Sequence, residues 1–189
     1  MKKLLLLLLL ILIGCSGTEP RTDGPYKEYY KNGQLKQEVT YKNNVKEGPF
    51  VYYYSDGDRE EGTYKNNVIE GPSVYYFSDG SREERTYKND LKQGRYVSYF
   101  SRGDRKEGTY KNNVKEGPYV HYLSGEFEGD RLEGTYKNNV REGPYVYYYS
   151  VGDREEGTYK NNVIEGPFVY YYSDGSREEG TYKNGVRSF

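Results

Sequence analysis

The sequence predicts an all-β protein, an extended single-layer twisted antiparallel sheet of about 14 short strands. The first observation is a repeat. The tripeptide Thr-Tyr-Lys occurs seven times, and the steps between copies are 23 residues, with one step of 26. The second is that each repeat contains two short runs rich in Tyr, Val and Thr, separated by turn dipeptides. Such runs are too short for helices, so each repeat is expected to be a hairpin that buries its apolar face against its neighbours.

Residues 1–15 are expected to be a lipoprotein signal peptide. Lys2 and Lys3 precede an unbroken apolar run, residues 4–13, which is too short to span a bilayer. The run closes on Leu12-Ile13-Gly14-Cys15, which resembles a bacterial lipobox. That resemblance implies that Cys15 becomes the lipidated first residue of an extracytoplasmic, membrane-anchored protein, in the outer membrane if the cell is Gram-negative. The alternative is a plain secretory signal with an incidental cysteine.

Residues 16–23 are polar and contain a proline, which is typical of a flexible tether, and residues 24–189 are expected to form the repeat domain. Cys15 is the only cysteine, so no disulfide is possible within the chain. Without the two signal lysines the chain has 26 basic and 29 acidic residues, which gives no electrostatic footprint for nucleic acid. The chain has 26 Tyr and no Trp, and tyrosine suits a half-buried pleated surface.

One repeat shows the expected elements in order. Gly48-Pro49 opens an aromatic strand at residues 50–54, and Ser55-Asp56-Gly57 ends it. A charged strand follows at residues 59–64, and Lys65-Asn66-Asn67 closes it. Asp-Gly and Asn-Asn both tolerate the positive φ that tight hairpin turns need, and the glycine at position 185 in the last copy fits such a position. In the charged strand, alternation places Glu60, Gly62 and Tyr64 on one face and Arg59, Glu61 and Thr63 on the other.

Equivalent positions in successive repeats form rows. One row is always tyrosine: Tyr29, Tyr53, Tyr76, Tyr99, Tyr122, Tyr148, Tyr171. This row is predicted to be structural and to form the stacking core together with the apolar row that follows it. The row before it also accepts Glu, Ser and His, and is predicted to be wet. Its larger side chains are therefore the candidate binding residues: Tyr52, Tyr75, His121, Tyr147, Tyr170.

The repeat resembles the MORN repeat, and it looks closest to the bacterial MORN variant often labelled a YwqK-family antitoxin. The resemblance covers residues 24–189 and is carried by Gly62-Thr63-Tyr64-Lys65-Asn66-Asn67, Glu70-Gly71-Pro72 and Tyr75-Tyr76-Phe77-Ser78-Asp79-Gly80. Tyr stands where many MORN repeats have Trp, Arg85 and Gly94-Arg95 depart from the pattern, and residues 124–132 hold three extra residues that should protrude. What the resemblance implies is a single-layer sheet that acts as a scaffold or adaptor and has no catalytic activity.

No chemistry-bearing cluster stands out in the sequence. His121 is the only histidine, and its equivalents are Tyr and Ser, so neither a catalytic base nor a metal site is expected, and no cofactor. Adjacent Glu pairs face opposite sides of a strand and do not converge. The expected function is a non-catalytic, membrane-anchored surface for a protein partner. The alternatives are a cell-wall or glycan binder that uses the tyrosine face, and an antitoxin-like neutraliser of a toxin.

Overall fold

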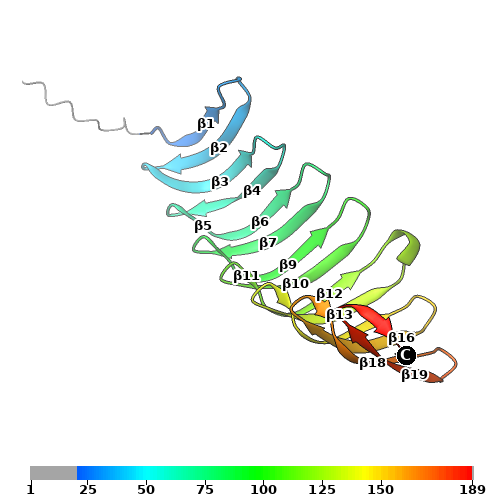
Figure 1. Cartoon of the computed structure of the whole chain (residues 1–189). Helices are drawn as coiled ribbons and strands as arrows, with labels where there is room; N and C mark the ends of the chain where they lie inside the picture. Colours follow the sequence, from blue (N-terminus) through cyan, green and yellow to red (C-terminus); the bar gives the residue numbers. More distant parts are fainter. Residues whose placement is uncertain (1–20, 189) are drawn as a thin grey trace, which may run out of the picture.

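The computed structural model describes residues 21–188, and within them the chain forms one antiparallel sheet of 20 strands. The strands lie side by side in sequence order, and the sheet is long, curved and twisted (Figure 1). Strand β1 pairs only with β2, and β20 pairs only with β19, so they are the two ends of an open sheet. The all-β, single-sheet prediction is confirmed. The predicted signal peptide, Cys15 and most of the tether lie outside the described residues.

The strands fall into three groups. Seven carry the aromatic runs: β1 (Gly24–Tyr29), β3 (Val45–Tyr53), β6 (Gly71–Tyr76), β9 (Gly94–Tyr99), β12 (Gly117–Tyr122), β15 (Gly143–Tyr148) and β18 (Gly166–Tyr171). Seven carry the charged runs: β2 (Leu35–Lys42), β4 (Arg59–Lys65), β7 (Arg82–Lys88), β10 (Arg105–Lys111), β13 (Arg131–Lys137), β16 (Arg154–Lys160) and β19 (Arg177–Lys183). These are the 14 strands that the sequence predicts. Short strands follow the Asn turns: β5 (Val68–Ile69), β8 (Leu91–Lys92), β11 (Val114–Lys115), β14 (Val140–Arg141), β17 (Val163–Ile164) and β20 (Val186–Ser188).

The Asn-Asn turns have the predicted left-handed backbone, and they also join neighbouring repeats. Asn66 and Asn67 have φ of 50° and 68°, as a two-residue hairpin turn requires. The Asn66 N–H donates to Oε2 of Glu47 in the preceding repeat over 2.8 Å. The Lys46 N–H donates to Oδ1 of Asn67 over 2.9 Å. Each turn is thereby held by the repeat before it, which explains why both Asn and Glu recur with the period.

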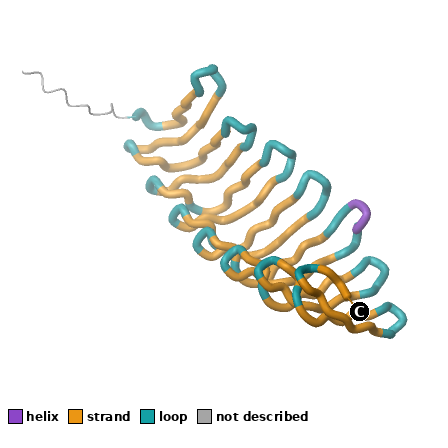
Figure 2. The backbone as a smooth tube through the Cα atoms, viewed as in Figure 1, coloured by secondary structure: helices purple, strands orange, loops and turns teal. Residues whose placement is uncertain are grey.

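The Asp-Gly turns lie along the opposite long edge of the sheet (Figure 2). In the second repeat Gly57 has φ of 94°, and its N–H donates to the carbonyl of Tyr54 over 3.1 Å. This is the three-residue hairpin loop in which glycine takes the left-handed position. The repeat with extra residues replaces this turn with a short 3-10 helix, η1 (Gly125–Phe127), on the same edge (Figure 2).

Candidate functional site

Strand alternation gives the sheet two different faces. The aromatic face carries the rows of Phe50, Tyr52, Tyr54, Glu60 and Tyr64, and the charged face carries the intervening rows. The two rows that contain Phe50 and Tyr64 supply most of the buried aromatic side chains of the described residues: Tyr41, Phe50, Tyr64, Tyr87, Tyr96, Tyr110, Tyr119, Tyr145, Tyr159 and Phe168. The core of this single-layer sheet therefore lies on its aromatic face.

Each ring of the Phe50 row lies over a glycine on the paired strand. Phe50 is directly opposite Gly62 in the β3–β4 register. A Cβ atom added to Gly62 would lie 2.8 Å from the ring, so no other residue fits there without a shift. The same arrangement joins Tyr96 to Gly108 and Tyr145 to Gly157. The glycine of the charged strand thus recurs because the ring needs its space.

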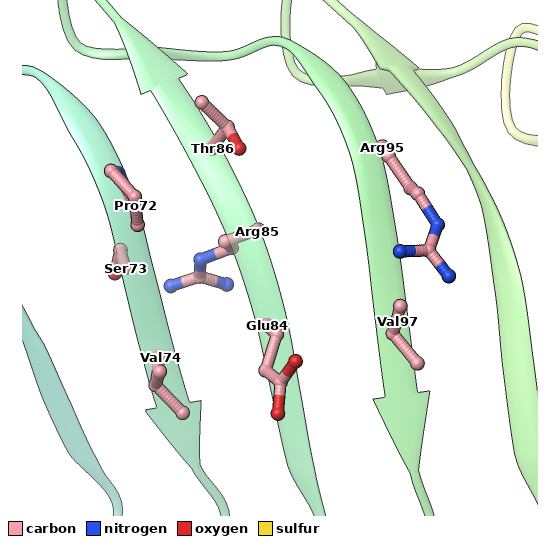
Figure 3. Close-up of a pocket in the computed structure, with 8 residues that line it drawn as sticks. All are labelled: Pro72, Ser73, Val74, Glu84, Arg85, Thr86, Arg95 and Val97. Atoms are coloured by element: carbon pink, nitrogen blue, oxygen red, sulfur yellow. The ribbon is translucent and has the colours of Figure 1, made fainter.

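One repeat fills this space differently. Ser73 replaces the ring and Arg85 replaces the opposite glycine, and the two are paired in the β6–β7 register. Figure 3 shows Arg85 beside the short side chain of Ser73. The Arg85 guanidinium is buried and lies 2.7 Å from Oε1 of Glu60 and 3.4 Å from Oε1 of Glu83. Two departures from the repeat therefore compensate each other, and the slot holds an ion cluster instead of a ring.

The charged face has a shallow hollow of about 290 Å³ at the same repeat (Figure 3). Val74, Glu84 and Val97 line its floor, and Arg95 stands where other repeats have proline. Arg95 is exposed and forms an ion pair with Glu107 on β10. The hollow is open, and its charged groups are already paired, so it offers less for recognition than the aromatic face.

A stripe of partly exposed rings runs along the Asp-Gly edge of the aromatic face. We call the rows of Tyr52 and Tyr54 the aromatic stripe. Rings of neighbouring repeats contact each other, with centroids 5.7 Å apart for Tyr54 and Tyr75 and 5.3 Å apart for Tyr149 and Tyr170. The outer row is the more exposed, at 37–40% for Tyr54, Phe77, Phe100 and Tyr172. Contiguous exposed aromatic side chains mark a binding surface.

The middle of the stripe is interrupted at the η1 turn by a hollow of about 410 Å³. Leu123 and Phe127 provide apolar walls, and the Phe127 side chain is 54% exposed. His121 and Asp104 line the polar side, with Nε2 of His121 3.2 Å from Oδ2 of Asp104. This hollow lies at the turn that holds the three extra residues.

Two repeat-family profiles match the chain. The profile of the MORN repeat variant matches residues 22–43, and the profile of the MORN repeat matches residues 40–59, 61–82, 133–154 and 156–177. Together these matches cover more than half of the chain. The chain is a MORN-repeat protein. Repeats of this kind are often protein-interaction modules, and the proteins that carry them are typically non-enzymatic.

Other comparisons are weaker. No curated protein matches the chain. The TCP10c domain of Drosophila melanogaster Sas-4 is similar in structure, with a TM-score of 0.45, 13% sequence identity and coverage of 87% of this chain and 96% of that one. The SAS-4 TCP domain of the same organism, solved in complex with a proline-rich motif of Ana2, has a TM-score of 0.46, 11% identity and coverage of 86% and 96%. Neither likeness says anything about the function of this MORN-repeat protein.

The predicted binding residues lie in the inner row of the stripe, which is half-buried rather than fully exposed to water. Tyr75, Tyr147 and Tyr170 are half-buried, and each hydroxyl donates to an aspartate of the preceding repeat, over 2.6–2.7 Å. The Tyr52 hydroxyl shares a hydrogen bond with that of Tyr64, and burial followed by this bond raises the pKa of Tyr52 to about 12. Ser98, in the same row, is buried. The rings of these tyrosines are still partly exposed on the aromatic face. Their role in binding stays a prediction.

The aspartates of these bonds hold the stripe in place, and they were not among the predicted site residues. Oδ1 of Asp58 accepts the Ser78 N–H over 2.9 Å, and Oδ2 accepts the Tyr75 hydroxyl. The Tyr75 hydroxyl and then the Ser78 N–H lower the pKa of Asp58 below its ordinary value. Asp153 is held in the same way by Tyr170 and Ser173. The signal was present, because this Asp and the Ser that follows the aromatic run both recur with the period.

The row predicted as structural core lies on the other face, which is a correction. Tyr53 and its equivalents are half-exposed, and Tyr29 is 56% exposed. Several of these rings stack on arginines of the charged strands: the Arg59 guanidinium is 4.3 Å from the Tyr76 ring, and that of Arg154 is 4.2 Å from the Tyr171 ring. The row is invariant because it pairs with arginine. The row of Tyr54, also predicted as core, is the exposed outer row of the stripe.

Within the described residues no group of three or more His, Cys, Asp and Glu could hold a metal ion. No described helix is long and apolar enough to cross a membrane.

Proposed function

We propose that this MORN-repeat protein is a non-catalytic docking surface for a protein partner, and that it is an extracytoplasmic protein anchored to a membrane through lipid on Cys15. The observation that supports docking is the aromatic stripe along one edge of the sheet, in which four outer rings are 37–40% exposed: Tyr54, Phe77, Phe100 and Tyr172. Tyr and Phe are enriched at protein interfaces because they bury a large area with few rotatable bonds. The repeat pattern supplies such rings at a regular spacing, which suits an extended partner.

The docking surface can be tested in intact cells with a photo-crosslinking amino acid placed at single positions. Phe77 and Tyr172 lie in the exposed outer row of the stripe, and Thr109 is an exposed control on the charged face. We expect protease-sensitive adducts from Phe77 and Tyr172 and none from Thr109. Equal capture from all three positions would contradict docking at the stripe.

The same experiment separates the alternatives. The tyrosine-rich stripe also suits sugar rings, because aromatic faces stack on them. Adducts that resist protease and disappear with cell-wall glycosidases would replace the protein partner with a glycan. A toxin among the captured proteins would give the YwqK-like antitoxin resemblance a functional meaning.

The anchor is tested separately, by detergent-phase partitioning of the full chain. Cys15 is the only thiol in the sequence, so Cys15→Ser leaves no site for thioether lipid. We expect the wild type to enter the detergent phase and the variant to lose its lipidated form. Equal partitioning after signal cleavage would contradict the lipoprotein assignment and leave the docking surface untouched.

A further inference from the structure

The centre of the aromatic face carries three cations that lack counter-ions. Lys106 lies on β10, Lys115 on β11 and Arg141 on β14, and all three are half-buried. Among residues 21–188 none of them forms an ion pair with a carboxylate. Nζ of Lys115 lies 4.6 Å from the Tyr96 centroid instead. The Arg141 guanidinium lies 4.4 Å from the Tyr159 centroid and donates to the Tyr159 hydroxyl and to the Asn162 carbonyl, both of which are uncharged. Unpaired half-buried charge costs stability, so a compensating benefit is expected.

The same region lacks hydrogen-bond acceptors that other repeats have. The Tyr145 hydroxyl donates to Oε1 of Glu155 over 2.5 Å. In two central repeats the equivalent of Glu155 is Lys106 or Leu132. The corresponding tyrosines are almost fully buried, and their hydroxyls have no hydrogen-bond partner among the described residues: Tyr96 and Tyr119. The centre therefore combines unpaired cations with unpaired donors, and the missing chemistry is that of a carboxylate.

The neighbouring charged groups do not neutralise the three cations. Burial, followed by the charges of Lys115 and Arg141, lowers the pKa of Lys106 to about 8. The nearby carboxylate of Asp104 is already bonded to His121, Ser124 and Arg102.

On the opposite side of the cations, burial lowers the pKa of Lys115 below its ordinary value, and the charge of Glu83 opposes this shift only in part. Glu83 is itself paired with Arg85 and accepts the hydroxyls of Ser98 and Tyr110. Because the carboxylates of Asp104 and Glu83 are already paired with other groups, the electrostatic potential at the centre of the aromatic face is positive.

The hollow at the η1 turn adjoins this positive centre. Lys106 is directly opposite His121 in the β10–β12 register, and His121 lines the hollow. Nζ of Lys106 is 5.8 Å from the Phe100 centroid, and Phe100 belongs to the stripe. An apolar side chain that enters between Leu123 and Phe127 would therefore place its neighbours near Lys106.

We propose that the centre of the aromatic face binds an acidic segment of a partner protein, with carboxylates at Lys106, Lys115 and Arg141 and an apolar side chain in the hollow beside η1. This inference rests on the proposed docking function and specifies its partner. The partner's carboxylates would supply, from outside the sheet, the negative charge that Glu83 and Glu155 supply in the flanking repeats. Charge complementarity of this kind selects the partner and speeds encounter.

The test uses the full chain in neutral detergent and a labelled synthetic peptide in which glutamates flank a phenylalanine. Fluorescence anisotropy reports binding to the wild type, Lys106→Met, Lys115→Met and a matched control, Lys111→Met, which alters an exposed lysine on the other face of β10. We expect the Met variants at 106 and 115 to bind at least about tenfold more weakly and the control to bind like the wild type. A peptide with glutamine in place of each glutamate should not bind, and added salt should weaken the glutamate peptide.

Several results would overturn the inference. Unchanged affinity of Lys106→Met, or equal binding of the glutamine peptide, would show that acidity is not recognised, while crosslinks at Phe77 and Tyr172 would leave the proposed function standing. Binding of phosphatidylglycerol vesicles through Lys106, with no peptide binding, would assign the patch to lipid. Peptide binding without any crosslinks at Phe77 and Tyr172 would instead contradict docking along the stripe and leave binding at the centre of the aromatic face. Circular dichroism of each variant confirms that a loss of binding is not a loss of fold.

Discussion

Two neighbouring regions of the aromatic face carry cations in different ways. At the β6–β7 pair, Arg85 lies within ion-pair distance of Glu60 and Glu83, both buried. At β10 and β11, Lys106 and Lys115 have no such carboxylate among the described residues. Where a departure from the repeat pattern places a cation beside carboxylates, the ion pairs rebuild the core. Where a departure removes a carboxylate, the nearby cations keep no counter-ion and are free to bind a carboxylate of a partner. The comparison separates structural from functional deviations within one repeat array.

The largest expected effect comes from breaking the paired region. Arg85→Met should lower the free energy of unfolding by about 3–5 kcal/mol, because Glu60 and Glu83 would remain buried without a cation. Chemical denaturation measures the change. The matched control is Arg82→Met, on the other face of the same strand, where an exposed pair with Glu84 and a stack on the Tyr99 ring together contribute about 1–2 kcal/mol. Similar losses in the two variants would refute the structural role of Arg85.

The second prediction converts the ion cluster into the ordinary ring slot. Adding Ser73→Tyr to Arg85→Gly should recover about 1–3 kcal/mol relative to Arg85→Gly alone, because a ring would again lie over glycine. Its hydroxyl would be placed to donate to Glu83, as that of Tyr145 donates to Glu155. A double-mutant cycle isolates the coupling. If the effects of the two substitutions on the free energy of unfolding are additive, the side chains at positions 73 and 85 do not occupy the same space in the core.

A smaller effect of opposite sign is expected in the unpaired region. Lys106→Met should raise the free energy of unfolding at pH 7 by an amount on the order of 1 kcal/mol, since it removes a half-buried charge that has no partner. The pKa of Lys106 is lowered to about 8 in the folded state, whereas the unfolded value is near 10.4. Between pH 8 and pH 10.4 the unfolded chain binds more protons than the folded chain. The free energy of unfolding of the wild type therefore rises with pH over this range, and its difference from that of Lys106→Met becomes smaller.

Denaturation of both proteins from pH 7 to about 9.5, below the range in which tyrosines ionise, measures this convergence. A pH-independent difference would mean that charge at position 106 is not what lowers the stability. Lys111→Met, at an exposed position on the same strand, should change the stability little at any pH in this range.

The turns and the alternation of the charged strand could be predicted because local chemistry determines them. Asn66 and Asn67 have positive φ as expected, and Glu60 and Tyr64 are buried on one face. The phase of the aromatic strand could not be read in the same way. Every position from Phe50 to Tyr54 is apolar or aromatic, so no alternation distinguishes its two faces. Invariance of the Tyr53 row suggested a core, but that row is invariant through contacts with arginine.

The site was predictable in part. The candidate binding residues do lie in one row of the aromatic stripe, but the bonds of its tyrosines to Asp58, Asp130 and Asp153 depend on contacts between repeats that a single row does not reveal. Two rows compared with each other indicate contacts that neither row indicates alone. Ser73 and Arg85 depart from the pattern in the same repeat and on paired strands, and such paired departures indicate contact. Lys106, which stands where other repeats have glutamate, was visible in the sequence as well.

The most direct test of the contrast between paired and unpaired cations is chemical unfolding of the wild type and Lys106→Met, each with and without a saturating amount of the glutamate peptide. Without peptide, the variant should be the more stable of the two. A ligand that binds only the folded state adds stability according to its affinity, so the peptide should stabilise the wild type strongly and the variant little. The order of stability should therefore reverse. Lower stability of Lys106→Met without peptide, or an order that the peptide leaves unchanged, would contradict the account.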